Sequence, residues 1–357
     1  MFRWIKRLFF LFVVIAIAAG AGGWWLYSRV IEPYRGYNEP EIFIDIPSGS
    51  GPGTIGQKLI AAGVVRDDLT FRTAIIVSGR ARALKAGEYR FAQPMHALDV
   101  IDKIARGDVY KRLLTFREGL TILDMAQVFE EKGFGKAEEF RKAAMNETLI
   151  ADLDPAAPDL EGYLFPETYS LPRDTPAAVV VQQMVAGFKR ALTDDMRASA
   201  NQDGLSVRDM VTLASLVEKE TGAPDERPLV AAVYRNRMKL RMPMQADPTV
   251  IYALQKAGKY NGNLTREHLR ELDSPYNTYK YAGLPPGPIA APGKASLQAA
   301  AKPADVDYLY FVSKNDGTHV FASTLAEHNK NVFEWQVEYF RRQRRERGTG
   351  NREPAKH

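Results

Sequence analysis

The stretch SVRDMVTLASLVEKET, residues 206–221, reads as one helix around which the rest of the chain is organised. Ser206 is a candidate N-cap, and Asp209 three residues later gives the spacing of a capping box before an apolar run. No Gly or Pro interrupts that run until Gly222 and Pro224, which are typical of a helix end. Four apolar side chains fall on one stripe at helical spacing: Met210, Leu213, Ala214 and Val217. We therefore expect this helix to dock on a core.

Two acids border that stripe at the end of the helix. Glu218 lies on one border, one turn above Ala214, and Glu220 lies on the other, beside Leu213 and Leu216. A carboxylic acid beside apolar and small side chains is poorly solvated in its charged form and keeps its proton, as a general acid must. The alternative is a surface helix whose charged edge serves solubility. The helix alone does not decide between them.

A run of 20 residues without a charge, Leu8 to Tyr27, is long enough to cross a bilayer. Trp residues at both ends resemble the aromatic belts of membrane proteins, and basic residues before the run favour a cytoplasmic N-terminus. The alternative is a cleaved signal peptide, since Ala16-Ile17-Ala18 has the small-x-small pattern of a cleavage site. We favour an uncleaved single-pass anchor in the plasma (inner) membrane, because the apolar run continues past that site. Either way, the rest of the chain is exported.

The charges of the chain are unevenly placed. The overall charge is +5, but the segment before the anchor is basic and the tail from Arg341 holds seven Lys and Arg against two acids. The body between them is therefore acidic, which argues against a nucleic-acid partner. The chain has no Cys, so the exported part is not a disulfide scaffold and depends on its hydrophobic cores.

The first exported segment predicts a compact unit of strand, helix, helix and strand, over residues 41–46, 54–62, 68–78 and 87–91. This layout looks like a LysM-type sugar-binding fold. We expect a mixed α+β body with an anchor in residues 1–28, a tether in 29–40, a LysM-like subdomain in 41–110, a catalytic domain in 111–340 and a basic tail in 341–357. A further helix is expected at 121–132, a hairpin at 307–322 and a last helix from Thr324.

Several common catalytic machines are missing from the sequence. There is no HExxH, GxSxG or Walker A motif, the five His show no metal-ligand spacing, and a Cys nucleophile is impossible. Gly51, Gly53 and Gly56 form GxGxxG, but no alternating strand–helix series follows to build a dinucleotide-binding sheet. We therefore expect no cofactor and no metal. Carboxylates, amides, Tyr and rigid Pro/Gly loops remain, the groups of a carbohydrate site.

Those groups gather after residue 160 in ordered motifs. They are LASLVEKET (213–221), NRM (236–238), MPMQADPTVIY (242–252), SPYNTY (274–279), GLPPGPI (283–289) and YLYFVS (308–313). Together they resemble the YceG-like family, the endolytic murein transglycosylases, over roughly residues 41–330. The resemblance implies a lyase that cuts MurNAc–GlcNAc links inside nascent peptidoglycan, with Glu218, the first acid of VEKE, as catalytic acid and base. Because the anchor would hold the substrate groove near new strands, we also expect the protein to act beside the synthases that polymerise glycan.

The chemistry implied needs one carboxylate. It protonates the glycosidic oxygen and then takes the proton of the muramic C6 hydroxyl, which attacks C1 and leaves a 1,6-anhydro end. A hydrolysing muramidase instead needs a carboxylate pair, and Asp247, Glu220 or Glu161 would then be the partner. A third possibility is a wall-binding scaffold without turnover.

The candidate substrate-binding residues each have a structural alternative. Gln245 and Asn277 carry amides that can bind sugar hydroxyl and acetamido groups, or can hold turns. Asp247 can bind substrate or start a helix with Pro248. Tyr276 and Tyr279 can offer flat faces to sugar rings or lie in the core. Glu220 completes the set, while Glu161 and Glu167 are the weakest candidates.

Overall fold

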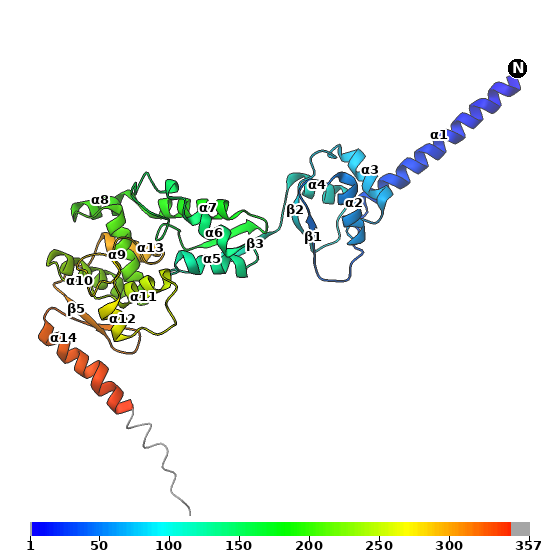
Figure 1. Cartoon of the computed structure of the whole chain (residues 1–357). Helices are drawn as coiled ribbons and strands as arrows, with labels where there is room; N and C mark the ends of the chain where they lie inside the picture. The colour runs from blue at the N-terminus through cyan, green and yellow to red at the C-terminus, as the bar shows by residue number, and fades with distance from the viewer. Residues whose placement is uncertain (1, 344–357) are drawn as a thin grey trace, which may run out of the picture. The chain divides into compact units, whose positions relative to one another are not determined.

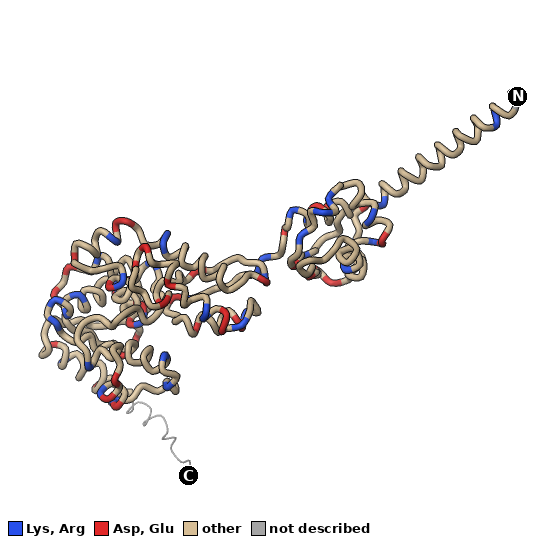
Figure 2. Tube along the Cα trace, turned by 45° about the horizontal axis from the view of Figure 1, so that its top comes forward, with Lys and Arg blue, Asp and Glu red and all other residues tan. Residues whose placement is uncertain are grey.

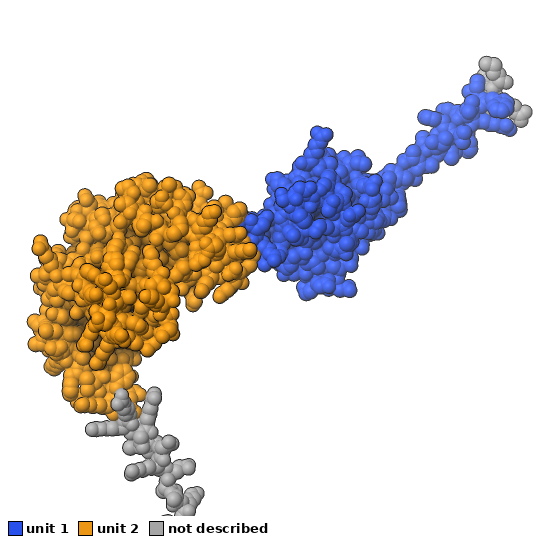
Figure 3. All heavy atoms as spheres, in the orientation of Figure 1, with its two compact units in different colours: residues 1–113, 170–175 blue, residues 114–169, 176–357 orange. Residues whose placement is uncertain are grey.

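The computed structural model describes residues 2–343, which form two compact units (Figures 1 and 3). Unit 1 comprises residues 1–113 and 170–175, and unit 2 comprises residues 114–169 and 176–357. Most of the expected basic tail lies outside the described residues. Helices dominate, and the strands of the described part form three two-stranded sheets, so the coarse α+β expectation is confirmed.

The chain begins with one long helix, α1 (Phe2–Ile31). Its segment from Trp4 to Ile31 is long and apolar enough to cross a membrane, and Figure 2 shows that charges occur only towards its ends. The last turn of α1 belongs to the fold of unit 1. Val30 is fully buried in the core, and Arg29 forms an ion pair with Asp67, the N-cap of the third helix.

Unit 1 has the predicted order of strand, helix, helix and strand. The elements are β1 (Ile42–Ile46), α2 (Pro52–Ala61), α3 (Asp68–Ser78) and β2 (Gly87–Phe91), followed by α4 (Ala97–Arg106). β1 pairs antiparallel with β2, with Ile44 opposite Tyr89, and both side chains are buried. Gly79 and Gly107 end α3 and α4 in the left-handed conformation, which Gly adopts without strain. The expected helix at 54–62 starts two residues earlier, because Pro52 fits the first turn.

A short ribbon, in which β3 (Lys111–Thr115) pairs with β4 (Thr168–Pro172), has residues in both units. The first helices of unit 2 are α5 (Ile122–Glu131), α6 (Ala137–Ala144), η1 (Glu147–Leu149), α7 (Ala177–Ala191) and α8 (Asp194–Gln202). Thr121 caps α5 with a full capping box, as the sequence predicts. Phe140 packs between Phe116 and Phe129, with ring centroids 5.7 and 5.4 Å away.

The helix expected from residues 206–221 is α9 (Val207–Glu220), and it lies at the centre of unit 2. Ser206 and Asp209 form the predicted capping box. Every residue from Met210 to Val217 is buried, not only one stripe, because helices surround α9. Those that follow it are η2 (Pro224–Glu226), α10 (Arg227–Lys239), α11 (Asp247–Lys256), α12 (Arg266–Glu271) and α13 (Lys294–Ala301).

The predicted hairpin closes unit 2. β5 (Tyr310–Ser313) pairs antiparallel with β6 (His319–Ala322), and Asn315 and Gly317 take positive φ values of 66° and 90° in the turn. The last described helix is α14 (Leu325–Val332), capped by Thr324 and continued by a π-helical turn, Phe333–Glu338.

Candidate active site

The last turn of α9 carries the two carboxylates on different sides. Residues two apart on a helix do not face each other, so Glu218 and Glu220 enter separate surroundings. The elements that pack on either side decide what each acid can do.

Glu218 is enclosed by groups of the chain itself. The Gly293 N–H donates to its Oε2 at 2.9 Å, and Arg227 Nη2 lies 3.4 Å from its Oε1. The Glu218 side chain is 6% exposed and that of Arg227 is 10% exposed. Arg227 also donates from Nε to Ser296 Oγ at 3.1 Å. Both oxygens of Glu218 are therefore engaged, and this carboxylate ties α9 to α10 and to the start of α13.

A second acid lies beside this pair. Glu118 Oε2 is 3.9 Å from Arg227 Nη2, and its carboxylate lies directly against the backbone of Gly293. Burial raises the pKa of Glu118, the charge of Glu218 raises it further, and Arg227 opposes both. Neither Glu118 nor Arg227 was predicted from the sequence as a site residue.

Glu220 faces a polar cavity of about 320 Å³ in unit 2. We call this the Glu220 pocket. Its lining comes from helices α9, α10, α11 and α14, from strand β5, and from the segments around residues 244 and 279: Glu220, Tyr234, Arg237, Met244, Gln245, Asp247, Tyr279, Phe311 and His328. Four of the predicted site residues thus meet in one cavity: Glu220, Gln245, Asp247 and Tyr279.

The environment of Glu220 suits a general acid. Burial raises its pKa to about 7, although the hydrogen bond from the Tyr234 hydroxyl, at 2.9 Å, acts the other way. The charge of Asp247 raises this pKa further, and that of Arg237 lowers it. A carboxyl group that titrates near neutral pH inside a cavity can give and take a proton.

Arg237 holds the rim of the pocket in place. Its guanidinium donates to the carbonyls of Leu309 and Met244, both at 2.7 Å, so it joins the start of β5 to the segment before α11. Gln245, the residue after Met244, has a φ of 51°, a conformation that residues other than Gly rarely adopt. Its N–H donates to the Thr278 carbonyl at 3.2 Å. Such strain is common at functional sites.

Asp247 is the first residue of α11, and its carboxylate points to the pocket instead of capping the helix. It accepts a hydrogen bond from the Tyr279 hydroxyl at 2.6 Å. Burial and this carboxylate raise the pKa of Tyr279. The pair places an acceptor and an aromatic face in the cavity that holds Glu220.

The other candidates lie away from the pocket lining. Asn277 is fully buried, and its amide donates to the Leu269 and Leu272 carbonyls while its Oδ1 accepts from the Tyr279 N–H. Asn277 therefore fixes the turn that presents Tyr279. Tyr276 packs on Tyr252, with ring centroids 5.0 Å apart, and burial raises its pKa to about 12.

Glu161 also lies outside the lining of the Glu220 pocket. Its oxygens lie 3.2 Å from the N–H of Ile122, at the start of α5, and 3.3 Å from the Tyr252 hydroxyl. Burial raises the pKa of Glu161 to about 8. Glu167 is exposed. Among the described residues, no cluster of acids and His suits a metal ion.

The part of the chain that holds both acids also matches known proteins. The model of the YceG-like family matches residues 44–334. The chain belongs to this family. An endolytic murein transglycosylase of Bacillus subtilis is 35% identical over 327 residues, which cover 87% of this chain and 89% of that protein. One of Streptococcus pneumoniae D39 is 30% identical over 362 residues, 92% of this chain but 65% of the streptococcal length.

A solved structure agrees with the fold of this YceG-like chain. The crystal structure of a putative YceG-like protein from Listeria monocytogenes is 31% identical, with a TM-score of 0.56, and covers 82% of this chain and 99% of that one. The family match spans all nine residues of the Glu220 pocket as well as Glu218.

Five lining residues of the pocket were not predicted as site residues: Tyr234, Arg237, Met244, Phe311 and His328. Arg237 lies inside the NRM motif and Phe311 inside YLYFVS, so the motifs held a signal for both. His328 was considered only for metal-ligand spacing, which it lacks. Nothing local in the sequence indicates that α14 returns to the end of α9.

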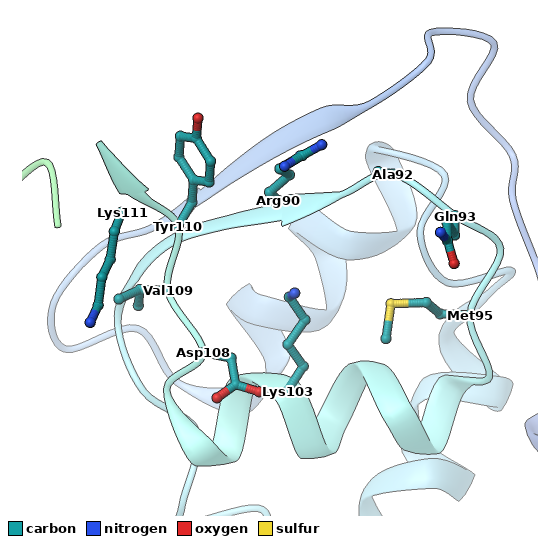
Figure 4. A pocket seen from close by; sticks show the side chains of 9 residues that line it. All are labelled: Arg90, Ala92, Gln93, Met95, Lys103, Asp108, Val109, Tyr110 and Lys111. Atoms are coloured by element: carbon teal, nitrogen blue, oxygen red, sulfur yellow. The ribbon is translucent and has the colours of Figure 1, made fainter. Parts of the chain in front are cut away.

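Unit 1 of this family member contains a larger, more open cavity of about 660 Å³ (Figure 4). It lies between β2, α4 and the segment 108–111. Lys103 points from α4 into it, Met95 lies along one wall, and Arg90 and Tyr110 stand at the rim. A cation, an apolar wall and an aromatic rim are suited to a sugar polymer that carries acidic groups.

Proposed function

We propose that the chain is an endolytic murein transglycosylase, a lyase that cleaves MurNAc–GlcNAc bonds within nascent glycan strands and leaves 1,6-anhydroMurNAc ends. The names of its relatives support the reaction. The observation that carries the proposal is the Glu220 pocket, where one acid with a pKa near 7 meets Gln245, Asp247 and Tyr279.

Within this proposal, Glu220 is the catalytic acid and base. Sequence reasoning assigned that role to Glu218, the first acid of VEKE. The geometry supports the second acid instead, because Glu218 is held by Arg227 and Gly293 whereas Glu220 lines an open cavity. Glu218 remains the competing assignment, and the test below separates the two.

Glu220 would act in two proton transfers. Its carboxylic acid gives a proton to the glycosidic oxygen as the bond from that oxygen to C1 of the muramyl sugar breaks. The C6 hydroxyl of the same sugar then attacks C1 and returns its proton to the Glu220 carboxylate. The Tyr234 hydroxyl, which donates to Glu220, stabilises the charged form between the steps. No water has to be activated, because the nucleophile is intramolecular.

A hydrolysing muramidase is the second candidate, and one observation favours it. Asp247 lies in the same pocket, close enough for its charge to raise the pKa of Glu220. Such a pair is what a hydrolase needs to activate water. Glu161 does not share the pocket and does not support this reading.

We further propose that α1 remains attached as a single-pass anchor with a cytoplasmic N-terminus and an extracytoplasmic body. The apolar segment from Trp4 to Ile31 continues well past the small-x-small site at residues 16–18, which supports an uncleaved helix, and its end is built into unit 1 through Val30 and Arg29. The cavity around Lys103 would let the LysM-like unit hold glycan strands. An anchored body would act on new strands beside the synthases that make them.

The test is mass spectrometry of products from purified glycan strands, with the full chain and its Glu218→Gln and Glu220→Gln variants. We expect ends lighter by one water than hydrolysed ends, present with Glu218→Gln and missing with Glu220→Gln. Hydrolysed ends would support the muramidase. Loss with Glu218→Gln in a folded protein, and not with Glu220→Gln, would return the role to Glu218. Binding without cleavage by the unmodified chain would indicate a scaffold.

A further inference from the structure

His328 of α14 is the most unusual member of the Glu220 pocket. Its Nδ1 is buried and has no hydrogen-bond partner within the described residues. The ring is stacked on Tyr310, with centroids 5.0 Å apart and planes 23° apart, so its orientation is fixed. Buried polar atoms of proteins are almost always paired, so an orphan atom at a cavity suggests a partner that arrives with the ligand.

The ring of His328 is suited to binding an uncharged polar group. Burial lowers its pKa, and the positive charge of Arg237 lowers it further. The other charged or titratable groups lining the pocket are Glu220, Asp247, Tyr234 and Tyr279. A neutral imidazole has one donor and one acceptor nitrogen, which match the C=O and N–H of an amide.

The same pocket offers an apolar surface. Met244 and Phe311 are its apolar lining residues. Met244 is fixed by its carbonyl, which accepts from Arg237, and Phe311 packs edge-on against Tyr234 at 6.0 Å. A ligand group that combines an amide with a methyl would satisfy both the imidazole and this surface.

We propose that His328 hydrogen-bonds the 2-acetamido group of the sugar next to Glu220, that Met244 and Phe311 contact its methyl, and that this contact makes the enzyme selective for N-acetylated strands. The inference rests on the proposed function and adds which group of the substrate the enzyme recognises. A strand whose amino sugars have lost their acetyl groups would present an ammonium there, which a donor nitrogen next to Arg237 disfavours.

The test compares N-acetylated glycan strands with chemically de-N-acetylated strands of the same length. For the unmodified chain we expect kcat/KM to be about tenfold lower on the deacetylated strands, the factor that corresponds to ~1.4 kcal/mol, as one lost hydrogen bond. For His328→Ala we expect KM on acetylated strands to rise about tenfold with kcat nearly unchanged. The difference between the two substrates should then shrink to less than about twofold, since both have lost the same contact.

Two variants control for structural effects. His328→Asn keeps an amide near the position of Nδ1 and should retain most of the selectivity. His96→Gln removes another buried Nδ1 that lacks a partner, in unit 1, and should leave both KM and selectivity unchanged. Selectivity that persists in folded His328→Ala would overturn the proposal.

A direct measurement covers the case in which His328→Ala does not fold. In the Glu220→Gln protein, NMR of the imidazole nitrogens should show a shift of the His328 signal with N-acetylated oligosaccharide and none with the deacetylated one. Equal shifts would overturn the proposal. Failure of the proposed function looks different, because the unmodified chain would then release no anhydro ends from either strand.

Discussion

The two sides of the last turn of α9 differ in what encloses an identical side chain. On one side, Glu218 meets Arg227, the Gly293 N–H and Glu118, and the chain itself satisfies the charge. On the other side, Glu220 meets the Tyr234 hydroxyl and a cavity, and burial raises its pKa to about 7. A paired, enclosed carboxylate stabilises a fold, whereas a desolvated one beside a cavity is available for chemistry.

This comparison predicts opposite outcomes for two conservative substitutions two residues apart. Removing the charge of Glu218 should reduce stability and spare turnover, and removing that of Glu220 should do the reverse.

The largest effect is expected for Glu220→Gln. An amide cannot protonate the glycosidic oxygen, so kcat should fall by about 10³-fold, within the range for loss of a general acid. The assay is release of anhydro ends from purified strands. Glu167→Gln, at an exposed acid of unit 2, is the matched control and should change kcat less than twofold. Activity within tenfold of the unmodified chain would exclude Glu220 as the acid.

Glu218→Gln should lower the free energy of unfolding by about 3 kcal/mol, because it leaves the buried Arg227 guanidinium without its nearest carboxylate. Glu118, at 3.9 Å, compensates only in part. Denaturant unfolding of the full chain measures this loss. The variant should keep at least a tenth of the activity at a temperature where it is folded. A stable but inactive variant would contradict the comparison.

The pH dependence provides a third test. The raised pKa of Glu220 means that the folded state holds a proton that the unfolded state releases above its ordinary value, 4.5. Stability should therefore fall as pH rises from about 4.5 to about 7, and kcat/KM should fall above about 7 as the acid form is lost. Glu220→Gln should remove the part of this loss that Glu220 causes and be more stable at pH 8, by about 2 kcal/mol, while buried Glu161, whose pKa is also raised, keeps its own part. If the variant were less stable than the unmodified chain at that pH, burial would not disfavour the charged form of Glu220.

Much of the framework could be predicted from local signals. Ser206 with Asp209 and the stop at Gly222 define α9, and Asn315 with Gly317 define the hairpin of β5 and β6. These features depend on residues a few positions apart, whose backbone preferences act within one turn. The ribbon of β3 and β4 is different, because its two strands pair across more than 50 residues of chain.

The choice between the two acids could not be predicted in the same way. Both border the apolar stripe of α9, and the helix pattern treats them alike. What separates them is Arg227 and Gly293 on one side, and Tyr234, Asp247 and His328 on the other. Most of those residues lie far from the acids along the chain, so only tertiary packing shows which carboxylate faces a cavity. The family resemblance pointed to Glu218, but the VEKE motif contains both acids and carries no information on which of them faces a cavity.

Tyr279→Phe tests the rim of the Glu220 pocket. It removes the donor to Asp247, which is 2.6 Å away, and leaves the aromatic face in place. We expect KM to rise by about three- to tenfold, in line with one hydrogen bond to a charged acceptor, and unfolding to change little. An unchanged KM would mean that the sugar does not contact this pair.

The smallest effect is expected at the N-terminal cap of α9, the helix that carries both acids. Ser206→Ala removes the side-chain oxygen that accepts from the Asp209 N–H at 3.1 Å, and with it half of the capping box of α9. Loss of such a cap costs about 1 kcal/mol. Because the cap lies at the opposite end of the helix from both carboxylates, kcat and the pH profile should remain unchanged while the denaturation midpoint falls. A change in the pH profile would show that the position of Glu220 depends on the whole length of α9, and not on the contacts of its last turn alone.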